Sequence, residues 1–277
     1  MATKFITYAA RVSAPRELAE VMDVLVLKQE NSRYRPRYGD TIINWGCSSI
    51  PPVLAGHNVR YLNHPDKVSI AVDKRHTLNI LHAAGVSVIQ HTTDLAEAQR
   101  WYRGGHVVIQ RNVVSGMQGD GIVICDPASR LLVPGDRGRL WTKYFNRKDE
   151  YRVHVCRGEA IDVQKKRLRT EVRDRLRRNE GGSAAEESEA SHVYRIRSYP
   201  NGWIFCRENV VCPPRVLQES IRAVNVLGLD FGAVDIGYRR SDSSARIFEV
   251  NTAPGIEGTS IAIYARALSR AVGGAAS

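Results

Sequence analysis

Hydrophobic and polar residues alternate along much of the second half of the chain, and this pattern predicts strands. In residues 149–156, Tyr151 and two valines alternate with Arg152 and His154, which places the last two on one polar face. Two further apolar runs, residues 231–236 and 247–250, flank a polar stretch. They predict an antiparallel hairpin.

The register of this hairpin follows from its turn. If the turn is centred near Asp242, Asp235 lies opposite Glu249. The same register aligns two apolar pairs, Val234 with Val250 and Ile236 with Phe248. Because side chains alternate faces along a strand, Asp235, Glu249 and Asn251 share the polar face.

Three oxygen-bearing side chains on one face favour a metal site. Opposed carboxylates repel each other unless a cation or a proton lies between them, and Mg²⁺ accepts one or two carboxylates together with phosphate oxygens. The alternative is a solvated polar face of a half-buried sheet. The rigid Asn251-Thr-Ala-Pro-Gly255 turn weighs against that alternative.

The first part of the chain alternates strand and helix patterns. Residues 5–8, 24–27 and 41–45 are strand-like, and a helix capped by Ser13 follows the first of them. This alternation predicts a small α/β lobe that ends near Asp66.

The middle of the chain predicts a second unit. One helix with Leu78 and Leu81 ends at Gly85, residues 86–90 form a strand, and Asp94 caps another helix. A strand at residues 107–110 then leads into a glycine loop and a strand at residues 122–125. The loop contains Ser115, Gly116, Gly119 and Gly121.

Glycines in this loop let backbone N–H groups approach phosphate oxygens. The order G-x-x-G-x-G lacks the Gly-Lys-Ser/Thr of a P-loop, and no helix follows it, which excludes Walker and Rossmann sites. The loop alone is also compatible with an ordinary hairpin turn.

Charge is concentrated in one segment of a basic chain, whose formal net charge is +11. Residues 165–178 carry eight Lys or Arg, and the acidic tract 180–190 that follows predicts a mobile loop. Residues 193–197 and 203–206 predict another hairpin. The basic segment could bind nucleic acid or form a solvated helix face.

Composition narrows the class of protein. Five scattered cysteines without a Cys-x-x-Cys pair argue against a disulfide framework and a zinc site. No apolar run is long enough for a membrane helix, and the first residues do not resemble a signal peptide. We therefore expect a cytoplasmic protein, or one in the host cytoplasm if a phage encodes it.

With these motifs in order, the chain resembles the ATP-grasp superfamily. It is most similar to the glutamate-ligase branch and to small bacteriophage ligases. The resemblance covers most of the last two hundred residues or so, and its most specific part is the motif from Gly228 to Gly258.

The resemblance implies an α+β ATP-grasp fold, in which two α+β subdomains clasp ATP behind a small α/β domain. The implied units are a pre-ATP-grasp domain at 1–66, an N-terminal subdomain with the glycine-loop flap at 67–140, and a C-terminal subdomain at 141–277. The last carries the metal site and a mobile insertion near 165–190.

The resemblance also implies roles for individual residues. Asp235, Glu249 and Asn251 would hold magnesium, with manganese as an alternative, and Lys74 would contact phosphate. The loop with Ser115, Gly116, Gly119 and Gly121 would cover the triphosphate, and the backbone of Lys143, Tyr144 and Phe145 would pair with adenine. Arg152 and Arg167 would face the acceptor and the γ-phosphate.

Two positions depart from the family pattern. The second nucleotide lysine is absent, and Arg111 is the nearest cation, which can still bind phosphate bidentately. Lys143 stands where many relatives have an acidic residue, which leaves Glu150 as a candidate for ribose binding.

The resulting hypothesis is an ATP-dependent carboxylate-amine ligase that works through an acylphosphate. Its partners would be ATP, a carboxylate and an amine from an amino acid, a peptide or a protein terminus. The alternatives are a small-molecule kinase of the same fold and a nucleic-acid-binding protein that uses residues 165–178. The sequence does not determine the oligomeric state.

Overall fold

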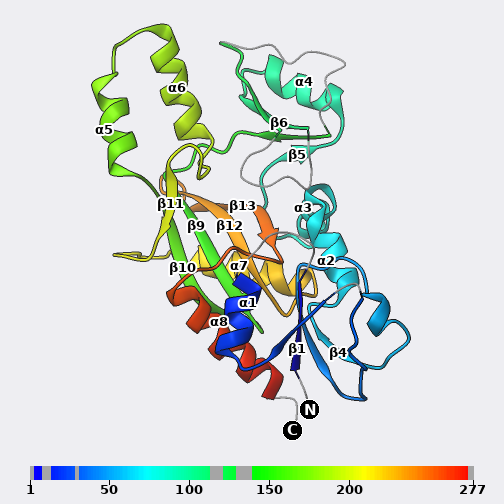
Figure 1. Ribbon diagram of the computed structural model, residues 1–277. Helices are drawn as coiled ribbons and strands as arrows, with labels where there is room; N and C mark the ends of the chain where they lie inside the picture. The colour runs from blue at the N-terminus through cyan, green and yellow to red at the C-terminus, as the bar shows by residue number, and fades with distance from the viewer. Residues whose placement is uncertain (1–2, 8–13, 29–30, 113–120, 129–138, 274–277) are drawn as a thin grey trace.

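The computed structural model describes residues 3–7, 14–28, 31–112, 121–128 and 139–273. These residues form three sheets with helices packed on and between them (Figure 1). No helix in the described ranges is long and apolar enough to cross a lipid bilayer.

The N-terminal sheet is parallel and has the strand order β2-β1-β3-β4. Its elements are β1 (Thr3–Thr7), α1 (Ala14–Val21), β2 (Leu25–Leu27), β3 (Thr41–Trp45), the 3₁₀ turn η1 (Pro52–Leu54) and β4 (Arg60–Leu62). The ring of Trp45 lies 5.3 Å from both the Phe231 and Tyr264 rings. The expected α/β lobe therefore shares a core with later parts of the chain.

The second sheet is antiparallel and has the order β5-β8-β6-β7. Its elements are β5 (His91–Thr92), α4 (Leu95–Arg103), β6 (Val108–Arg111), β7 (Ile122–Cys125) and β8 (Leu140–Lys143). Asp94 caps α4 as predicted, because its side chain accepts a hydrogen bond from the Ala96 N–H. Ala98 of α4 then packs on Val108 and Trp141 of the sheet.

The third sheet is the largest and has the order β11-β10-β9-β12-β13. Its strands are β9 (Asp149–Cys156), β10 (Glu159–Leu168), β11 (Trp203–Cys206), β12 (Phe231–Arg239) and β13 (Ser244–Asn251). Helix α7 (Pro214–Val226) packs on the face that carries Val153 and Val234. Helix α8 (Thr259–Gly273) packs on part of the other face, where the Tyr264 hydroxyl meets His154 Nδ1 at 2.9 Å.

Helices α2 (Pro65–Val72) and α3 (Lys74–Ala83) pack into the core of the third sheet. The strand expected at residues 86–90 is reduced to a bridge between Val88 and Ile247 of β13. Residues 86–90 thus contact the third sheet. Strand β8 of the second sheet continues to Lys143, past the predicted boundary at residue 140. The domain boundaries given above stay a prediction.

Most of the acidic tract is helical, so the prediction of a loop there is wrong. Helices α5 (Thr170–Arg178) and α6 (Ala184–Arg195) stand side by side at the upper left of Figure 1. Ser183 and Glu186 form a capping box that starts α6, and Val193 packs between Leu176 and Trp203. These local signals outweigh the polar composition of the tract.

The hairpin expected from residues 193–197 and 203–206 is also wrong. Residues 193–195 end α6, and β11 pairs with β10 instead, with Phe205 opposite Lys166. Val193 and Trp203 do pack together, but Val193 belongs to helix α6 and Trp203 to the start of strand β11.

The hairpin of β12 and β13 has the predicted register at Asp235 and Glu249 and at Val234 and Val250. Beyond these pairs it differs, because a bulge pairs Ile236 with Ile247 instead of Phe248. A bulge inserts an unpaired residue and re-aims side chains. Both Phe248 and Glu249 consequently line the same cleft.

Candidate active site

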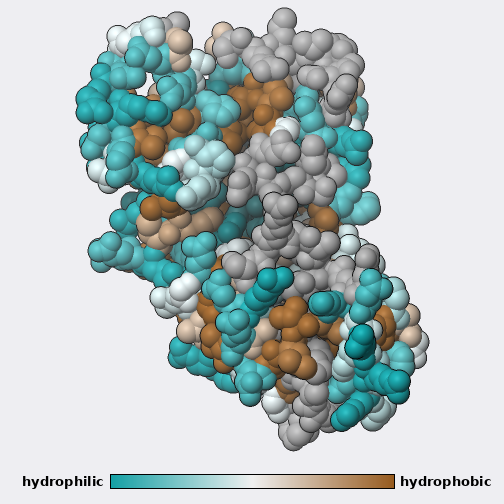
Figure 2. Space-filling model, viewed as in Figure 1, coloured by the Kyte–Doolittle hydropathy of each residue, from teal (hydrophilic) through white to brown (hydrophobic). Residues whose placement is uncertain are grey.

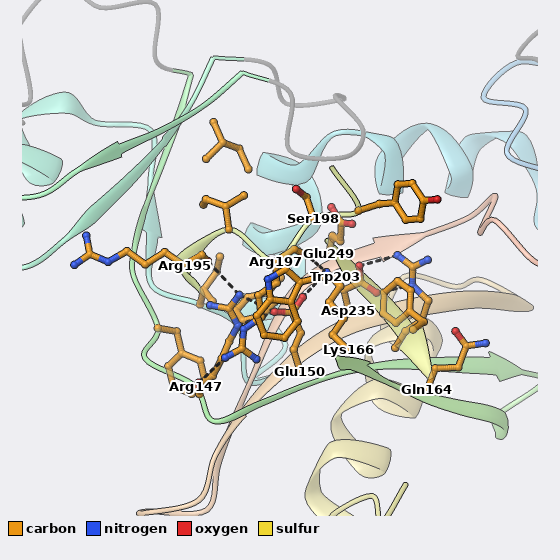
Figure 3. Close-up of a pocket in the computed structure, with 18 of the residues that line it drawn as sticks. Arg147, Glu150, Gln164, Lys166, Arg195, Arg197, Ser198, Trp203, Asp235 and Glu249 are labelled. Atoms are coloured by element: carbon orange, nitrogen blue, oxygen red, sulfur yellow. Dashed lines mark hydrogen bonds and ion pairs between the residues drawn. The ribbon is translucent and has the colours of Figure 1, made fainter. Parts of the chain in front are cut away.

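A cleft of about 710 Å³ lies between the second and third sheets. Nine Lys or Arg and four Asp or Glu side chains line it, and Figure 3 shows many of them converging. The cations are Lys74, Arg111, Lys143, Arg147, Arg152, Lys166, Arg195, Arg197 and Arg207, and the anions are Glu150, Asp235, Glu249 and Glu257. This excess of positive charge suits a polyanionic ligand.

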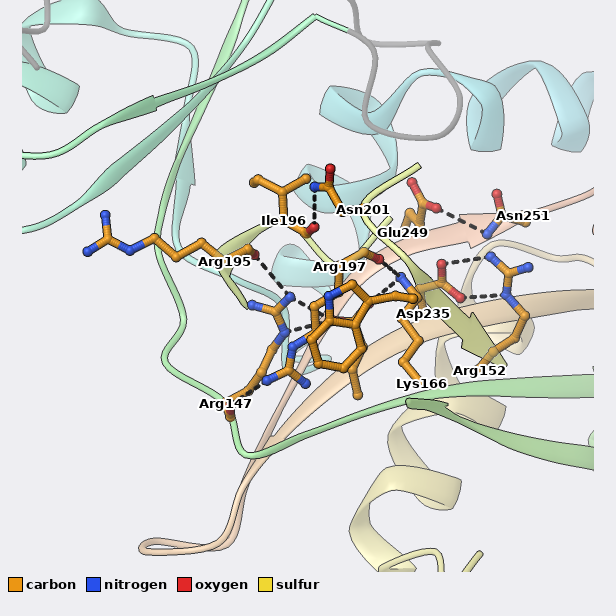
Figure 4. Close-up of polar contacts among 12 residues, drawn as sticks. Arg147, Arg152, Lys166, Arg195, Ile196, Arg197, Asn201, Asp235, Glu249 and Asn251 are labelled. Carbon is orange, nitrogen blue, oxygen red and sulfur yellow. Dashed lines mark hydrogen bonds and ion pairs between the residues drawn. The ribbon is translucent and has the colours of Figure 1, made fainter. Parts of the chain in front are cut away.

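The floor of the cleft is a row of polar residues across four strands. The strand registers place Gln164 of β10 beside Arg152 of β9, Arg152 beside Asp235 of β12, and Asp235 beside Glu249 of β13. Arg152 donates from Nε to Asp235 Oδ1 at 2.7 Å and from Nη2 to Oδ2 at 2.8 Å (Figure 4). Its guanidinium also lies 4.2 Å from the Phe205 ring, which fixes its plane.

Glu249 forms its ion pair with Lys74, not with Arg152. Lys74, at the start of α3, places its Nζ 3.1 Å from Glu249 Oε2. Burial favours a raised pKa for Glu249, but the charges of Lys74, Arg111 and Arg152 prevail and hold that pKa well below its usual range. Glu249 is therefore an anion in a cationic cleft.

Arg111 lies at the end of β6 and lines the cleft from the second sheet. Burial lowers the pKa of its guanidinium, while the Glu249 charge acts in the opposite direction. No ion pair within 4 Å involves Arg111 in the described ranges. A half-buried cation without a close carboxylate among the described residues favours an incoming anion.

The predicted metal ligands lie together but are not equally accessible. Asn251 Nδ2 approaches Glu249 Oε1 at 3.4 Å, whereas both Asp235 oxygens contact Arg152. Burial is the largest influence on Asp235 and raises its pKa, against the opposing effect of Arg152. Within the described residues no three His, Cys, Asp or Glu side chains form a metal cluster. Two carboxylates and one amide still suit Mg²⁺, which completes its shell with phosphate and water.

Glu150, the candidate for ribose binding, is already engaged. Its Oε2 lies 2.6 Å from Arg147 Nη2 and its Oε1 lies 2.6 Å from Lys166 Nζ, and its side chain is 4% exposed. Burial acts to raise the pKa of Glu150, but the charges of Arg147, Lys166 and Arg197 lower it to about 2. Its contacts therefore fix neighbouring cations.

The predicted hinge residues Lys143, Tyr144 and Phe145 all line the cleft. The Lys143 N–H donates to Gln90 O at 3.0 Å and the Tyr144 N–H donates to Val107 O at 2.9 Å. These bonds hold the hinge to the second sheet. Within the described part of the chain, the Phe145 N–H makes no such bond.

A second polar group lies beside the N-terminus of α8. Arg207 forms a two-pronged ion pair with Asp162, at 3.0 Å and 2.7 Å, and its Nη2 also contacts Ser260 Oγ. Gln164 Nε2 donates to Asp162 Oδ2 at 3.0 Å and to Ser260 Oγ at 3.2 Å. Arg207, Gln164 and Ser260 line the end of the cleft that lies near Gly255 and Glu257.

Most of the predicted glycine loop falls outside the described residues, and one predicted arginine lies away from the cleft. Ser115, Gly116 and Gly119 lie outside the described residues, and Gly121, the last glycine of the loop, has a positive φ of 67°. Arg167 does not reach the cleft, since it is exposed and donates to Glu208 O at 2.7 Å. Lys166 faces the cleft instead, because neighbouring strand residues point to opposite faces.

Sequence reasoning missed five cleft cations, namely Arg147, Lys166, Arg195, Arg197 and Arg207. Lys166 could have been found from strand alternation, since it shares the face of Gln164 and lies near Arg152. The other four lie outside regular strands, in turns or at the end of α6. No periodic pattern marks such positions.

Comparison with known proteins agrees with this architecture. No protein-family model matches the sequence. A probable alpha-L-glutamate ligase of Pseudomonas fluorescens Pf-5 is 24% identical over 237 residues, which cover 80% of this chain and 69% of that protein. This similarity spans most of the chain and indicates distant homology.

Solved structures are similar along the whole chain. The ligase PsnB in complex with a precursor variant, Mg and ADP gives a TM-score of 0.65 at 12% identity and covers 98% of each chain. D-alanyl-alanine synthetase A from Vibrio cholerae gives a TM-score of 0.64 at 11% identity and covers 99% of this chain and 98% of that one. These similarities identify the fold of the molecule shown in Figure 1.

Proposed function

Because the chain belongs to the ATP-grasp superfamily and is a distant homologue of the glutamate ligases, we propose that it is an ATP-dependent carboxylate-amine ligase. The α+β ATP-grasp fold predicted from the sequence is confirmed, while the bacteriophage part of the resemblance stays a prediction. The observation that carries the proposal is the row Arg152, Asp235 and Glu249 on the floor of a cationic cleft.

The adenine ring would lie at the hinge end of the cleft. Ile109 and Ile122 line it from the second sheet, and Phe248, re-aimed by the bulge, lines it from the third. These apolar groups provide a flat slot between the sheets, and the Phe145 N–H is a donor at its edge.

The phosphates would lie over the carboxylate row. Lys74 and Arg111 approach this region from α3 and β6, so the triphosphate would be held between the two sheets. Glu249 and Asn251, with Asp235 beside them, would hold magnesium. When bound, the metal would supply positive charge that offsets the charge of the phosphates and of the leaving ADP.

The reaction would proceed in two steps. A substrate carboxylate oxygen attacks the γ-phosphorus, the bond to ADP breaks, and an acylphosphate forms. An amine then attacks the acyl carbon, loses a proton and expels phosphate, which yields an amide. Both steps depend on positioning and on charge neutralisation rather than on a nucleophilic side chain.

Arg152 and Arg207 are the cations placed to serve the acceptor end. Arg152 lies between the phosphate region and Gln164, and Arg207 lies beyond it near Ser260. Arg152 would stabilise the oxyanion of the second step, and Arg207 would orient a substrate carboxylate. Substrates with carboxylate and amine groups, such as amino acids and peptides, suit this end of the cleft.

The test is an assay with magnesium, ATP and pooled amino acids and peptides. Mass spectrometry should find condensed products in step with ADP, and Glu249→Gln should abolish both while the circular dichroism spectrum stays unchanged. Phosphate retained on an acceptor hydroxyl would instead identify a kinase. Normal turnover by Glu249→Gln would refute the site.

A further inference from the structure

Residues 169–178, the part of the basic segment that does not line the cleft, form an ordered surface beside it. Arg169, Arg173 and Arg177 follow one another at intervals of four residues from the N-cap of α5 along the helix. Side chains at this spacing share one face of a helix. We call these three residues the arginine row. Figure 2 shows that the surface of α5 and α6 is largely hydrophilic.

The row begins at the rim of the cleft. The Arg169 guanidinium lies 4.5 Å from the ring of Tyr199, and Tyr199 is 61% exposed and lines the cleft. The Arg169 N–H donates to Gly202 O at 2.9 Å, which fastens the turn to the start of α5. A path of positive charge therefore leads from the cleft along the helix.

Packing contacts hold α5 in place. Val172 and Leu176 pack with Val193 and Trp203, and Gly202 lies so close that an added Cβ would be 2.7 Å from Val172 Cγ2. Arg175 holds α6 through Glu189 at 2.7 Å on another face of the helix. The row is thus held in place by contacts that do not involve its own charges.

The charges of the row are largely available. Among the described residues, Arg173 forms one ion pair, with its exposed neighbour Asp174 at 3.2 Å, and such surface pairs are weak. In the part of the chain that the structure describes, no ion pair involves Arg177. Exposed arginines of this kind favour a polyanionic partner over an isolated small anion.

We propose that the arginine row binds an acidic segment of a polypeptide substrate and leads its end into the cleft. Successive row positions are about 6 Å apart along the helix, and alternate carboxylates of an extended acidic chain are about 7 Å apart. The inference rests on the proposed function, since it assigns that carboxylate-amine ligase an acidic peptide as one substrate.

A peptide suits the surface better than a nucleic acid. Base stacking needs open aromatic faces, but Arg169 lies over one face of the Tyr199 ring, and Trp203 is buried. The row also begins at a cleft whose charged side chains suit a substrate carboxylate. An extended acidic chain can use both features.

The test compares two neighbouring arginines on different faces of α5. Arg177 belongs to the row, whereas Arg178 is also exposed but lies about 100° further around the helix, away from Arg169 and Arg173. Fluorescence anisotropy with a fluorescein-labelled polyglutamate peptide should show binding that weakens about tenfold in Arg173→Ala/Arg177→Ala and severalfold in Arg177→Ala. Arg178→Ala should bind like the wild type.

Equal weakening by Arg177→Ala and Arg178→Ala would overturn the proposal, because it would indicate attraction by net charge alone. Tighter, row-dependent binding of a single-stranded oligonucleotide of equal charge would also overturn it. The assay contains no ATP, so its result is independent of the ligation assay. Row-dependent peptide binding by a protein that forms no amide would support the surface and refute the proposed function.

Discussion

Asp235 and Glu249 lie directly opposite each other, yet each carboxylate has its own cation, Arg152 at 2.7 Å and Lys74 at 3.1 Å. The repulsion that opposed carboxylates would suffer is therefore relieved by side chains of the protein. Each carboxylate is thus paired with a cation of the protein, and a metal would add to this arrangement. This relationship has direct consequences for substitutions at both cations.

Replacing Lys74 with methionine should impair nucleotide binding and turnover. The change keeps the length of the side chain but removes the charge that faces Glu249 and the proposed phosphates. We expect kcat/KM for ATP to fall about a hundredfold, as measured by ADP release. Lys67→Met, in an exposed position of α2, is the matched control and should be close to wild type. Equal activity in both variants would exclude Lys74 from the site.

Replacing Arg152 with lysine should also be costly, although the charge is kept. Lysine cannot form the two parallel bonds to Asp235 or stack its plane on Phe205. We expect amide formation to fall about tenfold to a hundredfold. Arg157→Lys tests the same exchange outside the cleft, where the arginine contacts Asp230, and should have little effect. A variant Arg152→Lys with full activity would contradict the role of the bidentate pair.

Gly237 should be a sensitive position of the proposed adenine slot. A Cβ there would lie 2.5 Å from Phe248 Cζ and 2.9 Å from Arg147 Cδ, so Gly237→Ala must displace the ring. Overpacking of this kind costs about 1–3 kcal/mol of stability. We expect KM for ATP to rise about tenfold, measured by steady-state kinetics. Gly273→Ala, with no atom within 4 Å of the added Cβ, is the control. An unchanged KM would exclude Phe248 from nucleotide binding.

Glu150 should contribute stability that depends on pH. Its pKa is lowered in the fold to about 2 from an ordinary 4.5, so its contribution is complete above pH 4.5 and is lost as the pH falls towards 2. The full effect is about 3 kcal/mol.

Urea unfolding at a series of acidic pH values should therefore show a steep decline in the free energy of unfolding for the wild type. The decline should be shallower for Glu150→Gln. Glu187→Gln, in an exposed position of α6, should keep the wild-type slope. Identical slopes for all three proteins would show that Glu150 is not the titrating group.

Sequence patterns predicted the parts of the site that lie on regular strands. The alternation around Arg152 and the register of Asp235 with Glu249 follow from the two-residue period of a strand, and the structure has both. The same period would have selected Lys166 over Arg167 for the cleft. Our assignment of Arg167 followed family resemblance, which placed it one residue too far along the strand.

Other features depend on contacts between distant parts of the chain. The bulge that turns Phe248 into the cleft, and the pairing of β11 with β10, are not visible in local composition. The acidic tract was read from its polarity, although Ser183 and Glu186 at its start give a capping signal. Tertiary packing on Trp203 decided between loop and helix.

The bridge between Val88 and Ile247 fastens the segment after α3 to the strand that carries Glu249. Lys74 and Glu249 consequently belong to the part of the protein built around the third sheet, whereas Arg111 belongs to the second sheet. If the second and third sheets move apart, the Lys74–Glu249 ion pair stays intact, and Arg111 moves away from it. The proposed phosphate contact of Lys74 would then be available in both arrangements, and that of Arg111 only when the two sheets are close together.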